Sequence, residues 1–148
     1  MPTAIHARVR AARAGESPSL ICRVPSGFVV MGDSQLLRGY CLLLPDPVVA
    51  DLNALKDGDR ARFLHDMALI GDALLEVTGA VRCNYEILGN LDPALHAHIF
   101  PRFTTEPDAH KTLPPMTIPA ADRAAVPFDP VVNRTLMTRI ADAVLRRL

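Results

Sequence analysis

The feature that most constrains this chain is a short run in which two histidines alternate with aliphatic residues. His96 and His98 are separated by Ala97 and flanked by Leu95 and Ile99. Successive side chains of a β-strand point to opposite faces, so both imidazoles project from one face, about 6.6 Å apart along the strand. The pattern predicts a strand that packs one face into a core and lines a small-molecule site with the other.

A tight turn is predicted just before this strand, at Gly89-Asn90, because glycine adopts positive φ without steric cost and asparagine tolerates it. Backbone N–H groups bared by the turn would lie beside the imidazoles, an arrangement that binds phosphate or another oxyanion. The preceding run, 81–88, reads as an antiparallel partner strand. Asn84 lies on this strand. Because asparagine is depleted in strands, we expect its side-chain amide either to bind a ligand or to lie at an edge or turn and bond to water.

The rest of the chain predicts an α+β fold, with an antiparallel sheet of about five strands, a long helix across it and a C-terminal helix. Further strands are expected at 19–25, 28–32 and 39–45, and helices at 3–14, 59–78 and 130–147. The chain reads as one domain over 1–148, with its core at about 18–103 and a Pro-rich, extended segment at 104–130. Helix 3–14 is either a cap on the domain or a frayed end.

Two details of the helices are specific enough to test. The spacing of apolar residues in helix 59–78 predicts a buried stripe that includes Phe63 and Leu74, with Asp66 on the solvent side. The last helix is predicted to begin with Asp129 as N-cap and Pro130 in the first position.

Composition excludes several partners. The chain has 16 basic and 16 acidic residues, so it has no basic field for a nucleic acid polymer or an anionic membrane. No stretch approaches the roughly 20 apolar residues of a membrane span. The three cysteines (Cys22, Cys41 and Cys83) are scattered, which is typical of a reducing compartment, and we expect a cytoplasmic protein.

The histidine strand also resembles a known motif. LGNLDPALHAHIFPRF (88–103) is similar to the motif of the histidine triad (HIT) family, and is closest to the branch of small bacterial diadenosine-tetraphosphate hydrolase-like proteins. The resemblance extends upstream through VVMGDSQLLRGYCLLLP (29–45), over roughly residues 20–103. In that family histidines alternate with apolar residues, and Pro-Arg often follows.

The resemblance implies a nucleotide hydrolase or nucleotidyl transferase that binds a purine nucleotide or nucleotide conjugate. By position in the motif, His96 would attack the α-phosphate of a dinucleoside polyphosphate or nucleoside phosphoramidate and form a nucleotidyl-histidine intermediate. His98 would bind phosphoryl oxygens or orient the reacting groups. Asp33 would contact the ribose hydroxyls, although it could equally be a turn residue. Such a reaction needs no cofactor or metal of its own, and members of the family usually form homodimers.

The sequence departs from the motif at the first of the three histidines, which is Ala94 here, and at Leu91, where some members have serine or threonine. Loss of a positioning group weakens catalysis without abolishing binding, so a weak or inactive nucleotide-binding module is the alternative. Two other interpretations remain. The pair His96 and His98 could bind a metal, but the scattered cysteines do not complete a ligand set, and we predict no metal site. Both histidines could also be structural.

Overall fold

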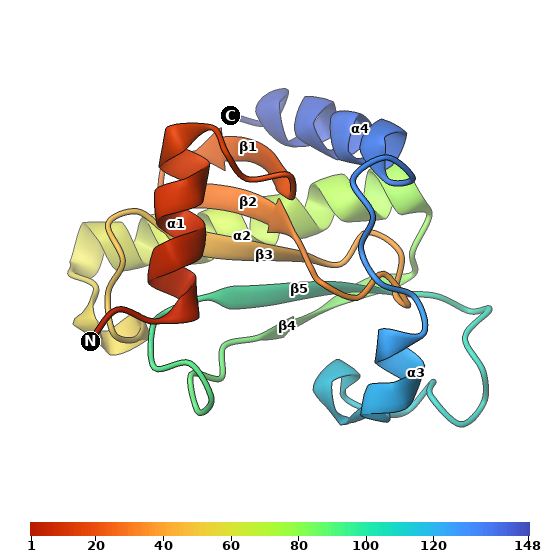
Figure 1. Ribbon diagram of the computed structural model, residues 1–148. Coiled ribbons are helices and arrows are strands. Elements are labelled where there is room, and N and C mark those ends of the chain that lie inside the picture. The colour runs from red at the N-terminus through yellow and green to blue at the C-terminus, as the bar shows by residue number, and fades with distance from the viewer.

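The computed structural model describes residues 1–148 and contains one five-stranded antiparallel sheet, in the order β1-β2-β3-β5-β4 (Figure 1). The strands are β1 Leu20–Val24, β2 Gly27–Met31, β3 Cys41–Pro45, β4 Arg82–Glu86 and β5 Ala97–Arg102. The helices are α1 Ala4–Ala14, α2 Asp57–Thr78, α3 Ala120–Ala124 and α4 Arg134–Leu145, with 3-10 turns η1 Leu52–Ala54 and η2 Pro115–Thr117. The predicted α+β fold class is therefore confirmed.

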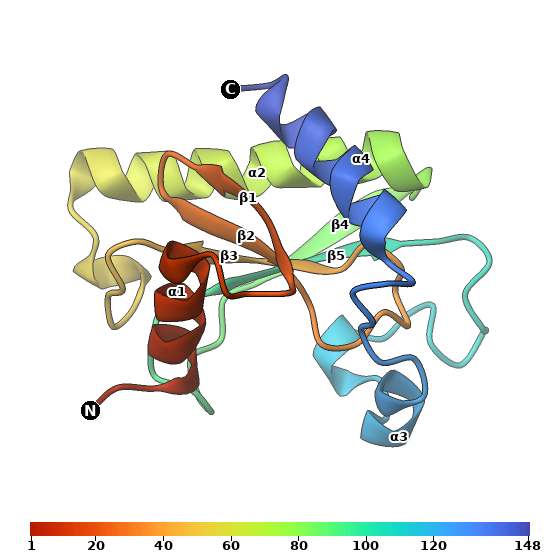
Figure 2. The same ribbon diagram turned by 45° about the horizontal axis from the view of Figure 1, so that its top comes forward.

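Helices cover both faces of the sheet. Figure 2 shows α2 and α4 on one side of it, and α1 and α3 on the other. The alternation of β5 divides its residues between two apolar clusters, because Ala97 and Ile99 pack with α2 and α4 whereas Phe100 packs with α1. The histidines therefore lie on the face that α1 covers. No helix is both long enough and apolar enough to cross a membrane.

Helix α1 caps the sheet and is packed against it. Ile5, Val9 and Ala12 are spaced by four and three residues and are all buried. This spacing puts them on one face of the helix, where they join the apolar cluster that contains Phe100. Of the two interpretations of residues 3–14, the structure supports the cap.

The long helix follows its predicted pattern with one exception. Phe63 and Leu74 are buried as expected, and Gly79 ends the helix with φ 72°, a left-handed conformation that glycine adopts readily. The prediction of a solvent-facing Asp66 was wrong, since the residue is 1% exposed. The backbone N–H of Ser26 donates to Asp66 Oδ2 at 2.9 Å, so the buried carboxylate has a partner from the β1–β2 turn.

The C-terminal third is more structured than the sequence predicted. The Pro-rich segment contains η2 and α3, and α4 begins at Arg134 rather than at Pro130. Asp129 still accepts from backbone N–H groups, those of Val131 and Val132, but the bonds close a turn that precedes the helix. Pro130 therefore does not open α4.

Candidate functional site

His96 and His98 lie together at the start of β5. The two residues are 8% and 7% exposed, and their ring centroids are 4.9 Å apart with the planes at 72°. Within the sheet His98 is opposite Leu42 of β3 and Glu86 of β4. Both imidazoles project from the same face of the strand, as the alternation predicted.

A cavity of about 290 Å³ opens beside the two rings, a volume at the lower end of small-molecule sites. Its walls come from α1, the loop after β2, β3, β5 and the segment around η2 and α3. The polar residues of the lining are Arg8, Asp33, Ser34, Tyr40, Asp92, His96, His98 and Arg123. The cavity therefore brings charged groups of both signs to the histidines.

The hydrogen bond of His96 determines which ring nitrogen is free. His96 Nδ1 lies 2.7 Å from the carbonyl oxygen of Ala94. A carbonyl can only accept, so Nδ1 carries a proton, and in the neutral imidazole Nε2 therefore has an unshared electron pair. His96 is thus arranged as an acceptor or nucleophile at Nε2.

His98 has the opposite arrangement. Its Nδ1 lies 2.5 Å from the hydroxyl oxygen of Tyr40, and the Tyr40 hydroxyl has no other partner in the protein. Burial raises the pKa of Tyr40, which keeps the phenol protonated. The Tyr40 O–H therefore donates to Nδ1, and the proton of neutral His98 is on Nε2. The two histidines present one acceptor and one donor.

The pKa of His98 is lowered to about 4, chiefly by burial and further by the charges of His96 and Arg8. His98 is therefore neutral near pH 7. In the unfolded chain a histidine gains its proton below about pH 6.5. Between about pH 4 and pH 6.5 the unfolded state binds more protons than the folded state, so acidification through this window destabilises the fold.

We expect His98 to contribute up to about 3 kcal/mol to this loss of stability. The measurement is the free energy of unfolding in urea at several pH values across the window, for the wild type and for His98→Gln. The wild type is expected to lose stability more steeply on acidification than the variant. Equal slopes would show that His98 titrates normally in the folded protein.

Tyr40 is positioned by its neighbours. Its ring stacks on Phe100 with centroids 4.1 Å apart. A Cβ at Gly32 would lie 2.2 Å from the Tyr40 ring, so only glycine leaves room for it. Tyr40 is absent from the residues predicted from the sequence. The available signal was a tyrosine at the start of a buried strand, because a buried phenol usually needs a hydrogen-bond partner.

Replacing Tyr40 with phenylalanine should remove the tautomer preference of His98 while preserving the stacking. We expect the ¹⁵N NMR spectrum of His98 to change from a single Nε2–H tautomer to a mixture, because Nδ1 loses its only donor. Tyr85→Phe is the matched control, since Tyr85 is the only other tyrosine and does not line the cavity. An unchanged spectrum in Tyr40→Phe would contradict the assignment.

The other predicted site residues have different positions. Asp33 lines the cavity, and its Oδ1 accepts from Arg8 Nη2 at 2.9 Å. Gly89 has the positive φ that was predicted, at 72°, but the chain bends at 90–92 without a hydrogen-bonded tight turn, and neither Gly89 nor Asn90 lines the cavity. Their part in binding an oxyanion stays a prediction. Ala94 is buried in the apolar cluster that contains Phe100.

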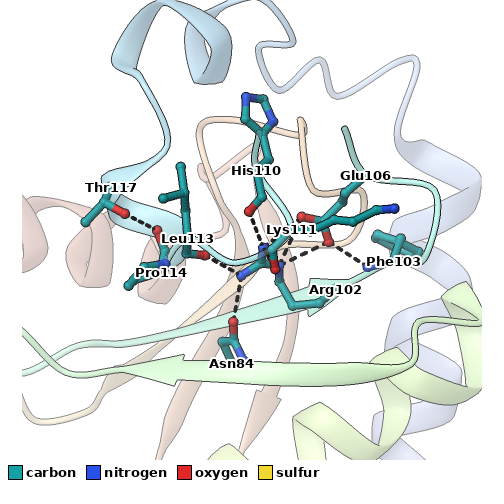
Figure 3. A network of polar contacts seen from close by, with 9 residues as sticks. All are labelled: Asn84, Arg102, Phe103, Glu106, His110, Lys111, Leu113, Pro114 and Thr117. Atoms are coloured by element: carbon teal, nitrogen blue, oxygen red, sulfur yellow. Dashed lines mark hydrogen bonds and ion pairs between the residues drawn. The ribbon is translucent and has the colours of Figure 1, made fainter. Parts of the chain in front are cut away.

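Asn84 lies outside the histidine cavity, which corrects its expected proximity to the imidazoles. Its Oδ1 accepts from Arg102 Nη1 at 2.8 Å (Figure 3). Asn84 lines a separate, wider hollow beside β4. Arg102 also donates to the carboxylate of Glu106 and to the carbonyls of His110 and Leu113. The amide of Asn84 is thus occupied by a network that fastens the Pro-rich segment to the sheet.

The structure contains no cluster of metal-binding side chains. No group of three or more His, Cys, Asp or Glu side chains lies close enough together to bind one ion. The three cysteines are free thiols.

No family model matches the sequence, and no curated protein matches it. Solved structures do match in fold. A histidine triad protein from Sinorhizobium meliloti 1021 superposes with a TM-score of 0.72 at 22% identity, over 90% of this chain and 93% of that one. A histidine triad protein from Marinobacter aquaeolei VT8 also gives 0.72, at 16% identity over 97% of both chains. A hypothetical histidine triad nucleotide-binding protein from Sulfolobus tokodaii strain 7 gives 0.72 at 13% identity, over 95% of this chain and 92% of that one. The fold is therefore that of the histidine triad proteins.

Proposed function

We propose that this chain is a member of the histidine triad family, in its diadenosine-tetraphosphate hydrolase-like branch, and that it binds a purine nucleotide or nucleotide conjugate in the histidine cavity. The observation that carries the proposal is the pairing of a free electron pair on His96 Nε2 with an N–H on His98 Nε2. A phosphoryl group needs both a nucleophile at phosphorus and a donor to its oxygens. The fold similarity and the motif support the same conclusion.

The proposed reaction cleaves the conjugate at its α-phosphate. His96 Nε2 forms a bond to phosphorus, and the bond from phosphorus to the leaving oxygen or nitrogen breaks, with its electron pair going to the leaving group. His98 Nε2–H donates to a phosphoryl oxygen as negative charge develops there. Water then attacks phosphorus, and the bond from phosphorus to His96 Nε2 breaks with its electron pair returning to the ring. This releases the nucleoside monophosphate and a proton of the water and restores neutral His96.

The remaining site assignments follow the motif. Asp33 lines the cavity with a side chain that is 90% exposed, and is proposed to accept from the ribose hydroxyls. The backbone N–H groups at Gly89 and Asn90 are proposed as further donors to the phosphate once a ligand is bound. We propose a cytoplasmic location because the three scattered cysteines are free.

A second candidate function is a nucleotide-binding module with little or no turnover. The specific observation is Ala94, which is 1% exposed and leaves no polar group at the position of the first histidine. The test compares diadenosine polyphosphates with amine-linked adenylates as substrates, followed by mass spectrometry of acid-quenched protein. Turnover with a nucleotidyl adduct on His96 supports the enzyme. Binding of AMP without turnover or adduct supports the module, and no binding of any nucleotide contradicts both.

We also propose a homodimer formed through β4. This strand is at one edge of the sheet, and β1 is at the other. Val81 and Leu88, on either side of β4, are 58% and 47% exposed. An edge strand flanked by exposed apolar residues is a surface on which a second copy can extend the sheet.

If the dimer forms through β4, charge introduced at this edge should dissociate it. Val81→Asp together with Leu88→Asp should shift the protein from dimer to monomer, because a carboxylate is costly to bury in an interface. Multi-angle light scattering at several concentrations measures the mass. Val132→Asp is the control, since Val132 is 78% exposed and lies away from β4. A monomeric wild type would contradict the proposal.

A further inference from the structure

The histidine cavity also contains two arginine side chains. Arg8 of α1 and Arg123 of α3 both line it. Arg123 uses its Nε–H to bind the carbonyl oxygen of Ile118 at 3.0 Å. Arg8 also has a single hydrogen bond, from Nη2 to Asp33, so most of the N–H donors of both guanidinium groups are free. Only Arg8 is paired with a carboxylate that also lines the cavity.

The position of Arg8 is fixed by the packing of α1. Ile5 and Val9, on either side of it in sequence, are 4% and 1% exposed, and the Ile5 N–H donates to Asp92 Oδ2 at 3.1 Å. Arg8 is on the flank of this buried stripe and reaches the cavity wall. Arg8 and His98 line the same cavity, and the charge of Arg8 contributes to the lowered pKa of His98.

The ion pair between Arg8 and Asp33 is suited to exchange. The Asp33 side chain is 90% exposed, and exposed ion pairs are weak because water screens them. A phosphate presents several charged oxygens, and a guanidinium binds such groups through two parallel N–H donors. A nucleotide phosphate can therefore take the guanidinium, while the Asp33 carboxylate becomes available to hydroxyl donors.

A cation is needed at this point of the site. His98 is neutral near pH 7, and Ala94 supplies no third imidazole. A nucleotide phosphate brings one to two negative charges, which are costly to bury beside neutral groups alone. We propose that Arg8 is a substrate-binding residue, which exchanges its ion pair with Asp33 for the phosphoryl oxygens of the nucleotide at His96 and His98. This inference rests on the proposed function of the same cavity.

The test distinguishes binding of the phosphate group from binding of the nucleoside. Calorimetric titration measures the Kd of AMP and GMP, and of adenosine and guanosine, for the wild type, Arg8→Gln, Arg8→Lys and Arg10→Gln. Arg8→Gln should raise the Kd of the bound nucleotide about tenfold or more, because its phosphate loses a charge-assisted bond. The Kd of the corresponding nucleoside, which has no phosphate, should stay within about threefold of the wild-type value. Arg8→Lys should recover part of the loss. Arg10 is the matched control, as an exposed arginine of the same helix.

The freed Asp33 carboxylate could itself repel phosphate in Arg8→Gln, and the double variant Arg8→Gln/Asp33→Asn removes that effect. Nucleotide binding that stays weak in the double variant supports a direct contact, and full recovery overturns it. Equal affinities for Arg8→Gln and Arg10→Gln, or a loss seen only with Arg123→Gln, also overturn the inference while leaving the proposed function intact. A wild type that binds neither nucleotide overturns both.

Discussion

Replacing His96 with alanine is expected to lower turnover of an adenylyl conjugate by a factor of about 10³ or more, equivalent to at least about 4 kcal/mol of transition-state stabilisation. His96 is the residue whose free Nε2 can form a bond to phosphorus, because Nδ1 is bound to the Ala94 carbonyl. No other side chain of the cavity has a free neutral nitrogen with an electron pair. AMP affinity should change much less than turnover, since His98 and the cavity walls remain.

The measurement is the steady-state rate together with the Kd of AMP. His65→Ala is the control, because His65 is an exposed histidine on α2. A variant with turnover close to that of the wild type would show that phosphorus is attacked by water directly or by another residue. The rate must be compared at saturating substrate, so that weaker binding is not read as slower chemistry.

Arg102→Leu is expected to destabilise the fold by about 3–5 kcal/mol. Arg102 is 6% exposed, and its guanidinium binds the Glu106 carboxylate, whose side chain is 7% exposed. The same group donates to Asn84 and to the carbonyls of His110 and Leu113 (Figure 3). Without it the buried Glu106 charge has no cationic partner and keeps only the Phe103 N–H as a donor, and the Leu113 carbonyl has none. This is more costly than the loss of an ordinary surface ion pair.

Urea denaturation measures this loss, and two further variants identify its cause. Arg102→Leu/Glu106→Leu should recover part of the stability, because the uncompensated charge is removed as well. Lys111→Leu should change the stability by less than about 1 kcal/mol, since Lys111 pairs with Asp108 in an exposed position. A loss of stability for Arg102→Leu no greater than that for Lys111→Leu would contradict a structural role for the network.

The same variant has a consequence for the site. Pro115, Met116 and Ile118 line the cavity and follow directly after the segment that Arg102 fastens. Detachment of this segment would open the wall of the cavity opposite α1. Hydrogen exchange in Arg102→Leu should therefore increase in residues 103–118 before it increases in β5.

Local patterns were sufficient for the elements that carry the histidines. The alternation around Ala97 predicted β5, and the three-and-four spacing around Phe63 and Leu74 predicted α2. The apolar runs predicted β1, β2 and β3. These patterns depend only on the repeat of a strand or a helix, so a single sequence contains them. The tautomer of His96 is similarly local, because the Ala94 carbonyl is two residues away.

Contacts between distant residues were not predictable in this way. Tyr40 and His98 are 58 residues apart, Arg8 and Asp33 are 25 apart, and Ser26 and Asp66 are 40 apart. Each pair depends on the order of strands and on how helices cross the sheet. Asp66 was therefore assigned to solvent, Asn84 was expected near the histidines, and α1 was given no part in the site.

The most direct test of a phosphate site between the two histidines is a crystal structure of the protein with AMP. The expected result places phosphoryl oxygens within about 3.2 Å of Nε2 of His98, with phosphorus facing Nε2 of His96. A nucleotide bound elsewhere, or rings whose Nε2 atoms turn away from the phosphate, would contradict the account.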